Sequence, residues 1–422
     1  MLDAVSLDLS KTHPFDPAVL ESPWRYYAQL RAEAPVFRDP FLGIFHVASY
    51  DLVLEALRDF ETFSNRFAPA MGAGALAALA GDPELEAMRE KSYPPVDTML
   101  TADPPEHKRF RGLVNKAFTP RRVDGLEPGI TKLAGELIDA FADDGRFEVL
   151  SQFSVLLPLT VIADQLGVPH ADLPRLKRWT DGFTAQLSGM AFGEDAKEAA
   201  RRIFEFQQYF AQRIEAARQA PREDILSDLV RARLEGERPL DVAEMLSILQ
   251  QLLVAGNETT AAAIAEGLLL LVQNPEQLAL VREEPALVPN LVEEVLRFAT
   301  PTTSMWRKAT RDTVLGGVAI PAGSMALLRF ASANRDESRF EGADRFDVRR
   351  ANASEHLAFG HGIHFCLGAM LARKEMAVAF RALLARLDGF RLAAGRPAPL
   401  HKPSMLLRGL AELHLEFDRR PA

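Results

Sequence analysis

The chain has 422 residues, of which 48% are hydrophobic and 25% charged, and its 49 basic and 58 acidic side chains give a formal net charge of −9. This composition is ordinary for a globular protein and excludes disordered, collagen-like and mucin-like chains. The acidic balance argues against nucleic acid as a partner, because binding phosphates needs a basic face.

The N-terminal segment, MLDAVSLDLSKTHPFDP, lacks the basic stretch followed by an apolar stretch that marks a signal peptide. No run reaches about 18 uninterrupted apolar residues, the length that a membrane-spanning helix needs. We therefore expect a cytoplasmic protein without membrane insertion. Cys366 is the only cysteine, so an intrachain disulfide is excluded.

Helical periodicity dominates the sequence. Apolar spacing predicts amphipathic helices at residues 20–34 and from Val47, and helical patterning returns over residues 177–220. The stretch 67–100 is rich in Gly, Ala and Pro and is expected to form a long loop. Within it, the segment GAGALA at 72–77 fits a dinucleotide-binding pattern, but it follows a proline rather than an apolar strand and is interpreted as loop.

Strand signals are short. Residues 36–47 alternate aromatic and β-branched side chains around Gly43, which is typical of a hairpin. Further strands are expected at 313–321, at 325–330 and in the C-terminal LAELHLEF. The predicted fold class is mainly α with small β-sheets (α+β).

The most informative helix is predicted to begin at Asp241, where Glu244 completes a capping-box pattern, and to end before Pro275. It spans about 33 residues, or roughly 50 Å, and is apolar nearly all round, so it should be buried. Its centre, Gly256–Thr260 (GNETT), holds poor helix formers and an acid. The pattern allows two helices joined by a turn, but the flanking alanines favour one helix with a functional distortion.

The single cysteine lies in the segment FGHGIHFCLG at residues 359–368. Its glycines permit unusual backbone angles and close contact with a flat partner. An amphipathic helix follows directly, so Cys366 precedes a helix N-terminus, where the dipole favours a thiolate. A lone cysteine is more often an inert buried residue, but the glycines and the helix start favour a ligand here.

Two other interpretations of this segment were weighed. A zinc cluster of His356, His361, His364 and Cys366 lacks the paired spacing of structural zinc sites. A cysteine nucleophile would need a histidine partner and an oxyanion hole, and nothing outside this loop offers them.

Three motifs resemble the cytochrome P450 family. The F-x-x-G-x-x-x-C-x-G pattern ending at Gly368 resembles the haem-binding loop, and AGNETT at 255–260 resembles the oxygen-activating I-helix motif. Glu294 and Arg297 match the family's E-x-x-R. All three occur in the family's order and spacing, and the similarity extends over nearly the whole chain, as in soluble bacterial members.

The resemblance implies one cytochrome P450 domain over residues 1–422, with a long central I helix over the haem and the cysteine loop on its proximal side. The smaller β-rich part would be formed mainly by about 35–65 and 300–350, with the C-terminal strands. The cofactor would be haem b (iron protoporphyrin IX), with the Cys366 thiolate bound to its iron, and thiolate donation favours cleavage of the O–O bond.

The resemblance also implies residue roles. The cofactor-binding residues would be His107, Arg111, Ala255, Gly256, Arg307, Phe359, Gly360, His364, Cys366, Leu367 and Gly368. Among them His107, Arg111, Arg307 and His364 would bind the haem propionates, since buried carboxylates need charge-assisted donors. The amides of Leu367 and Gly368 would donate to the cysteine sulfur.

In the I-helix motif, Glu258 and Thr259 would be the catalytic pair that relays protons to dioxygen. Ala255 and Gly256 would leave room for dioxygen, and Asn257 and Thr260 would support the distorted turn.

Glu294 and Arg297 share a helix face at i, i+3 and are assigned a structural role. Arg350 is the expected third member of their network, with Arg345 as the alternative.

The implied reaction inserts one oxygen atom of O2 into a C–H bond of a hydrophobic small molecule. Nothing in the chain resembles a flavin or NADPH domain, so electrons would come from a ferredoxin and its NAD(P)H-linked ferredoxin reductase, docking on a monomer. The basic residues expected to receive the ferredoxin are Lys108, Arg109, Lys116, Arg121, Arg122, Arg373 and Lys374. The alternatives are a haem peroxygenase and a non-catalytic haem-binding protein, and the pair Glu258-Thr259 argues for monooxygenation.

The substrate pocket is expected to be mainly apolar, which favours a terpenoid, steroid or aromatic molecule. Its walls would include Val254, Thr302, Met305 and Met405, together with residues 67–99, residues 183–192, Gln251 and Leu406.

Overall fold

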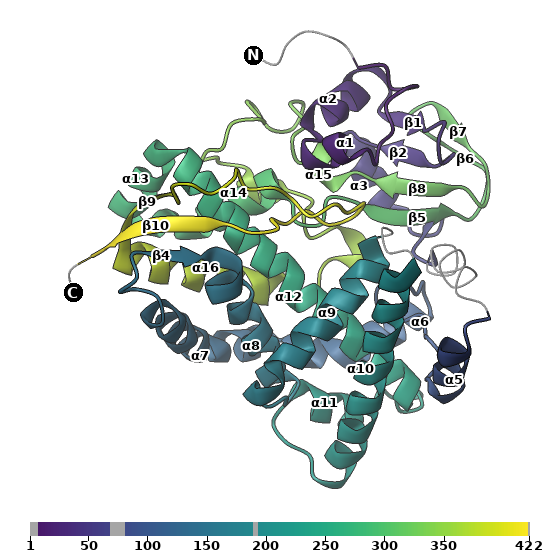
Figure 1. The fold of residues 1–422 in the computed structure, drawn as a ribbon. Helices are drawn as coiled ribbons and strands as arrows, with labels where there is room; N and C mark the ends of the chain where they lie inside the picture. Colours follow the sequence, from purple (N-terminus) through teal and green to yellow (C-terminus); the bar gives the residue numbers. More distant parts are fainter. Residues whose placement is uncertain (1–6, 68–80, 189–192, 421–422) are drawn as a thin grey trace. The chain divides into compact units, whose positions relative to one another are not determined.

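The computed structural model describes residues 7–67, 81–188 and 193–420. Contacts within the chain gather into two compact units, the first made of residues 1–64, 126–157 and 259–422, the second of 65–125 and 158–258. Figure 1 shows mostly helices with the strands gathered in small sheets, which confirms the predicted fold class. The single domain over residues 1–422 stays a prediction. In the described part of the chain, no helix combines the length and apolarity needed to cross a membrane.

The first unit contains a five-stranded sheet. Its strands lie in the order β1 (Val36–Arg38), β2 (Phe45–Val47), β8 (Met325–Leu328), β5 (Met305–Ala309) and β3 (Phe63–Ser64). The predicted hairpin is present, because β1 and β2 pair antiparallel and Gly43 takes a φ of 69° in the connection. The sheet therefore joins an N-terminal segment to residues 305–328.

The remaining strands form separate sheets. β6 (Thr313–Leu315) and β7 (Val318–Ile320) make a two-stranded hairpin. The C-terminal strand β10 (His414–Arg419) does not extend the five-stranded sheet. It pairs with β4 (Arg146–Glu148) and β9 (Leu387–Leu392) instead.

Seven helices of the described chain lie wholly within the first unit. They are α1 (Pro17–Glu21), α2 (Trp24–Glu33), α3 (Tyr50–Arg58), α13 (Pro275–Glu283), α14 (Val288–Ala299), α15 (Phe330–Ala333) and α16 (Ala369–Arg386). The predicted helix at 20–34 is wrong in its extent: α1 ends before Pro23 and α2 starts after it, since proline has no N–H to continue a helix. Val53 and Leu57 of α3 belong to one buried cluster with Val47 and Leu328 of the sheet.

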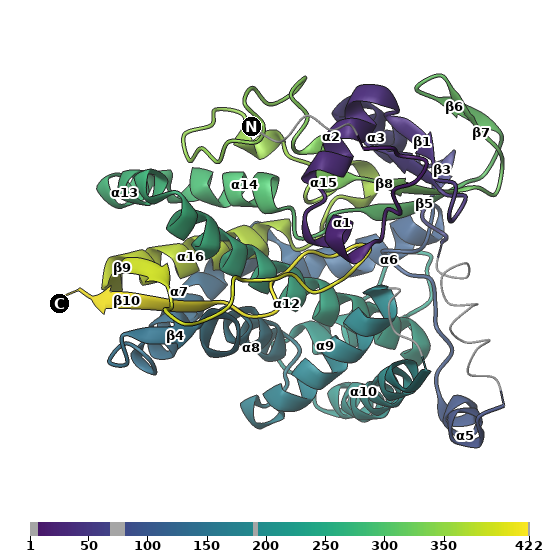
Figure 2. The same ribbon diagram turned by 45° about the horizontal axis from the view of Figure 1, so that its top comes forward.

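The second unit is helical. Its helices are α5 (Pro83–Lys91), α6 (Glu106–Val114), α9 (Leu173–Ser188), α10 (Gly193–Gln219) and α11 (Ile225–Arg231), while α7 (Pro120–Asp139), α8 (Leu156–Gln165) and α12 (Val242–Gln273) cross the unit boundaries. Figures 1 and 2 both show α9 and α10 side by side, where Trp179 meets Phe206 and Phe210 edge-on. The predicted loop at 67–100 is wrong in part, because it contains α5, capped by Asp82.

Short helical turns complete the described chain: η1 (Asn115–Phe118), η2 (Leu150–Ser154), η3 (His170–Asp172), η4 (Pro285–Leu287), η5 (Ala353–Glu355) and η6 (Gly362–His364). Two predicted segments lie outside the described residues, namely GAGALA at 72–77 and the end of the pocket segment at 189–192.

The helix α12 is continuous over 32 residues. Its start is the predicted capping box, because Glu244 N donates to Asp241 Oδ1 and Asp241 N donates to Glu244 Oε2, each at 2.9 Å. The helix runs without a break through Gly256–Thr260, so the favoured single helix is confirmed and the two-helix alternative is wrong, while the expected distortion stays a prediction. Strong helix formers on either side outweigh the poor formers at the centre.

Candidate active site

The cysteine loop closes on itself through its backbone. The Cys366 amide donates to the Phe359 carbonyl at 2.9 Å, and Gly360 and Gly362 take φ values of 68° and 71°. A Cβ atom on Gly362 would lie 2.9 Å from the carbonyl oxygen of Leu57, at the end of α3. Glycine is therefore required at residue 362 by both backbone angle and space.

Cys366 lies at the start of α16, where Gly368 is the N-cap residue. Its side chain is partly exposed. The partial positive charge at a helix N-terminus stabilises a thiolate, so this position suits a metal ligand. The aromatic ring of Phe359 lies under the guanidinium of Arg373, 4.6 Å from ring centroid to Cζ, which orders the beginning of the loop.

The histidines near Cys366 make separate contacts. His356 Nδ1 accepts from the Ala358 amide at 3.1 Å and its Nε2 lies 3.2 Å from Glu293, while His361 Nε2 lies 3.5 Å from Arg58. Across the residues that the structure describes, no three His, Cys, Asp or Glu side chains are grouped to hold a metal ion. A zinc cluster in this loop is therefore not supported.

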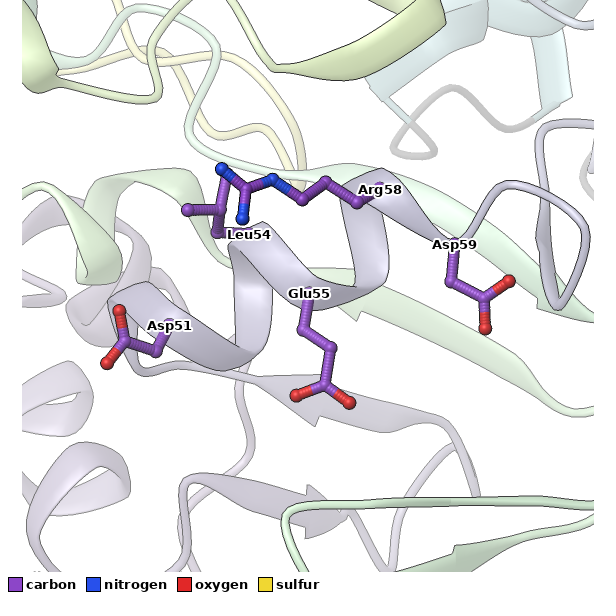
Figure 3. A pocket seen from close by; sticks show the side chains of 5 residues that line it. All are labelled: Asp51, Leu54, Glu55, Arg58 and Asp59. Atoms are coloured by element: carbon purple, nitrogen blue, oxygen red, sulfur yellow. The ribbon is translucent and has the colours of Figure 1, made fainter.

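Figure 3 shows a surface depression on α3, the helix whose end abuts Gly362. Its lining consists of Asp51, Leu54, Glu55, Arg58 and Asp59. Four of these five side chains are charged, so the depression does not suit a hydrophobic substrate.

A buried ion network lies behind the loop in the first unit. Arg297 donates to both carboxylate oxygens of Glu294, at 2.7 and 2.8 Å, and both side chains have no exposed surface. Arg350 Nε lies 3.2 Å from each of the same oxygens, so it is the third member. The guanidinium of the alternative, Arg345, contacts Asp347 on the surface.

Backbone groups complete this network. Arg297 also donates to the carbonyls of Asn334 and Ala343, and Arg350 donates to those of Glu341 and Gly342. The two arginines thus tie α14 to the segment 334–350, because each charge is satisfied by several acceptors.

On α12, the carboxylate of Glu258 faces a cation from α9. Lys177 Nζ lies 3.5 Å from Glu258 Oε1 and also contacts Asp181. Burial lowers the pKa of Lys177, but attraction to Glu258 and Asp181 outweighs burial and raises that pKa above its ordinary value. Sequence reasoning missed Lys177, since it lies 81 residues before Glu258 and no local pattern joins them.

The other residues of the I-helix motif differ in surroundings. Ala255 is exposed, whereas a methyl group on Gly256 would lie 3.6 Å from Ile162 of α8, an ordinary packing distance. Thr259 is partly buried and Thr260 is buried. Asn257 is fully buried, and neither atom of its amide meets a hydrogen-bond partner within the described chain, so this side chain does not support a turn.

The four predicted propionate donors fall into two pairs. His107 and Arg111 lie one turn apart on α6 in the second unit, and burial together with Arg111 lowers the pKa of His107. Arg307 of β5 and His364 of η6 belong to the first unit. Arg307 is buried and donates to the Trp306 carbonyl at 2.7 Å.

Two of the predicted pocket segments meet in the first unit. Thr302 pairs with Leu407 in an isolated antiparallel bridge, and the Thr303 amide donates to the Leu406 carbonyl at 2.8 Å, so the segment that carries Met405 runs beside the segment that begins at Thr302. Met305 follows in β5, and Val254 lies on α12 in the second unit.

Gln251, which is expected at a pocket wall, makes two hydrogen bonds through its side-chain amide. Its amide accepts from the Leu100 N–H at 3.1 Å and donates to Thr98 at 2.8 Å. These two bonds hold the chain before α6 against α12 within the second unit.

Several basic side chains expected at a docking face are engaged in ion pairs. Arg109 is 11% exposed and lies 2.8 Å from Glu244, so it is not a surface charge. Arg122, Arg373 and Lys374 pair with Asp228, Glu293 and Glu127, respectively. Lys108, Lys116 and Arg121 are exposed.

Comparison with known proteins identifies the family. The sequence model of the cytochrome P450 family matches residues 184–410. The 6-deoxyerythronolide B hydroxylase of Saccharopolyspora erythraea is 36% identical over 398 residues, covering 94% of this chain and 96% of that protein. The chain belongs to the cytochrome P450 family, and it is a monooxygenase that works with a haem, dioxygen and a redox partner.

Solved structures agree. Cytochrome P450 CYP109Q5 from Chondromyces apiculatus is 38% identical, with a TM-score of 0.85 over 98% of this chain and 100% of that one. CYP109E1 from Bacillus megaterium, solved in complex with testosterone, is 31% identical, with a TM-score of 0.79 over 93% of this chain and 99% of that one.

The loop residues fit a haem. Gly360 and Gly362 add no side chains to the loop. A methyl group built on Gly368 would meet no heavy atom of the described chain within 4 Å, so there is open space beside the loop. The partly exposed Cys366 at a helix N-terminus would supply a thiolate to hold the haem iron.

Proposed function

We propose that this monooxygenase binds haem b through Cys366 and hydroxylates hydrophobic small molecules with electrons from a ferredoxin. The observation that carries the proposal is the partly exposed Cys366 in a glycine-bounded loop at the start of α16. Bound haem supplies the iron chemistry that activates dioxygen for insertion into a C–H bond.

Residues of the chain hold the thiolate, position the loop, deliver protons and bind the haem propionates. The dipole of α16 keeps Cys366 as a thiolate, and the Glu294–Arg297–Arg350 network fixes the segment that leads to the loop. Glu258 delivers protons towards dioxygen, oriented by Lys177, and the Thr259 hydroxyl passes them on. His107, Arg111, Arg307 and His364 bind the haem propionates.

The substrate is a hydrophobic molecule, since Val254, Met305 and Met405 contribute apolar side chains to the expected walls. The sequence favours a terpenoid, a steroid or an aromatic molecule. The similarity to 6-deoxyerythronolide B hydroxylase adds macrolide precursors to these classes, and the complex of CYP109E1 with testosterone supports a steroid. Titration of the ferric protein with a macrolactone, a steroid and a terpene, followed by the spectral shift of the haem, ranks these classes.

The electron donor is an acidic ferredoxin with its NAD(P)H-linked reductase. The exposed side chains of Lys108, Lys116 and Arg121 provide complementary charge despite the net charge of −9. Complementary charge mainly speeds association, so this contact is sensitive to salt.

The experiment is the visible spectrum of the purified protein. We expect a red protein whose reduced carbon monoxide complex has the red-shifted Soret band of thiolate-ligated haem, and a pyridine complex characteristic of haem b. A Cys366→Ala variant with an unchanged spectrum would contradict the role of the thiolate. Turnover with hydrogen peroxide alone, at the rate seen with ferredoxin, would instead favour a peroxygenase.

A further inference from the structure

A hairpin between β9 and β10 carries the predicted pocket residue Met405. The hairpin is closed by two backbone bonds, from Ala411 N to Leu400 O at 2.8 Å and from Lys402 N to Gly409 O at 3.0 Å. At its tip, the Ser404 hydroxyl accepts from the amides of Leu406 and Leu407. The tip is therefore an ordered turn whose position depends on what holds the base.

His401 at the base of this hairpin joins two other elements. Its Nδ1 lies 2.7 Å from Glu21 Oε1 at the end of α1, and its Nε2 lies 2.7 Å from Glu266 Oε1 on α12. The His401 amide also donates to Glu21 at 2.9 Å. Carboxylate oxygens only accept, so each ring nitrogen of His401 that carries a proton donates to one of the two acids.

This cluster is largely buried. The side chains of His401 and Glu266 are 10% and 8% exposed, and that of Glu21 is 35% exposed. The charged group that faces the cluster from the same hairpin is Arg408, which donates to the carbonyls of Leu20 and Glu21 at 3.2 and 2.9 Å. Buried ion pairs add little net stability, but they impose a definite geometry on the elements that they join.

The hairpin is also in close contact with α12. A Cβ atom on Gly409 would lie 3.1 Å from the Cβ of Ala262, one turn before Glu266. Figure 2 shows the chain between β9 and β10 running along α12. Because the Arg408 amide donates to the Pro301 carbonyl at 2.8 Å, the hairpin also reaches the segment that carries Thr302.

We propose that His401 is a positioning residue for substrate selectivity, because its bridge between Glu21 and Glu266 fixes the hairpin that carries Met405 and pairs with the segment of Thr302. The inference rests on the proposed function of this chain as a haem monooxygenase with Met405 at its substrate pocket. A loosened base would let the tip move, and ligands that reach Met405 would then bind less tightly than ligands that do not.

The test compares two azoles that bind the haem iron of the holoprotein. Imidazole is too small to reach the pocket walls, whereas clotrimazole carries three aryl rings that do. We expect His401→Ala to weaken clotrimazole binding about tenfold and imidazole binding by less than about twofold. His401→Gln keeps one hydrogen-bond donor, so its affinity for clotrimazole should lie between those of the unmutated protein and His401→Ala.

The matched control is His414→Ala. His414 is the first residue of β10, and its Nε2 lies 2.9 Å from Glu412 Oε2. It should leave both affinities within about twofold. Thermal unfolding and haem content are measured for every variant. If His401→Ala does not retain haem, Glu266→Gln, which keeps the size and one acceptor of the acid, provides the same comparison of the two azoles.

Two outcomes overturn the inference. One is a folded variant with unchanged affinity for clotrimazole, and the other is an equal loss for both azoles in step with lower stability, which shows a structural role alone. Failure of the proposed function looks different, since the unmutated protein would then show no spectral shift with imidazole.

Discussion

The ammonium nitrogen of Lys177 lies 3.5 Å from a carboxylate oxygen of Glu258. The two side chains come from α9 and α12 of the second unit and are 29% and 17% exposed. Attraction to Glu258 and Asp181 overcomes burial and raises the pKa of Lys177, so the cation persists at neutral pH. The acid proposed to deliver protons is thus oriented by a neighbouring helix rather than by α12 alone.

Replacing Lys177 with Met should slow product formation about three- to tenfold while the substrate-induced spectral shift is kept, because the carboxylate loses its orienting cation. The solvent isotope effect on product formation should rise as proton delivery limits the rate. Lys132→Met is the control, since the side chain of Lys132 is 79% exposed and pairs with Glu136 on α7. Equal kinetics in the two variants would contradict the role of Lys177.

The catalytic pair should fail in two different ways. Without the Thr259 hydroxyl, we expect Thr259→Ala to consume NADH while hydrogen peroxide replaces product. Without the acid, Glu258→Gln should slow NADH consumption and product formation together. Product formed per NADH consumed, measured beside haem content, separates the two. Full coupling in Thr259→Ala with normal haem content would refute its part in the relay.

Breaking the buried ion network should be costly. Glu294→Gln removes one charge from a cluster in which Arg297 is fully buried and Arg350 nearly so, and we expect the free energy of unfolding to fall by about 3–5 kcal/mol. Urea unfolding measures this loss. Arg345→Ala, at an exposed side chain, should change it by less than about 0.5 kcal/mol. Comparable effects at the two positions would rule out a structural role that depends on burial.

Stability should fall in mild acid because of His46. Its Nδ1 accepts from Arg329 at 3.0 and 2.8 Å, and burial, followed by repulsion from Arg329, lowers the pKa of His46 to about 4 against the opposing influence of Asp39. Below about pH 6.5 the unfolded chain binds a proton that the folded chain rejects until about pH 4. The free energy of unfolding should therefore fall over this window, by up to about 3 kcal/mol.

His46→Asn keeps a hydrogen-bond acceptor for Arg329 but does not titrate. Unfolding midpoints of this variant should depend less on pH between about 4 and 6.5 than those of the unmutated protein. Parallel pH profiles would show that other groups cause the acid sensitivity.

The structure changes which basic residues are expected to receive the ferredoxin. Arg109 is held by Glu244, so its reversal would damage the fold, whereas Lys116 and Arg121 are exposed. The double change Lys116→Glu and Arg121→Glu should slow reduction by ferredoxin about tenfold at low salt and weaken the dependence on salt. Arg396→Glu, at another exposed position, should do neither. An unchanged reduction rate in the double variant would place the docking site elsewhere.

The sequence alone determined features that depend on short spacings. The capping box of Asp241 and Glu244, the ion pair of Glu294 and Arg297 and the position of Cys366 before α16 all follow from neighbours within a few residues. Such contacts are set by the repeat of a helix, so the order of residues is sufficient to predict them. The same local reasoning favoured one helix through Gly256–Thr260 because strong helix formers flank the weak ones, and α12 is continuous there.

Only the tertiary structure decided which distant side chains complete these groups. Lys177 meets Glu258 across 81 positions, and His401 meets Glu266 across 135. No local pattern distinguishes these residues from the many solvated charges of the chain. These side chains pair because packed helices and hairpins bring their charges together where water no longer solvates them. Which charges meet therefore depends on the fold as a whole.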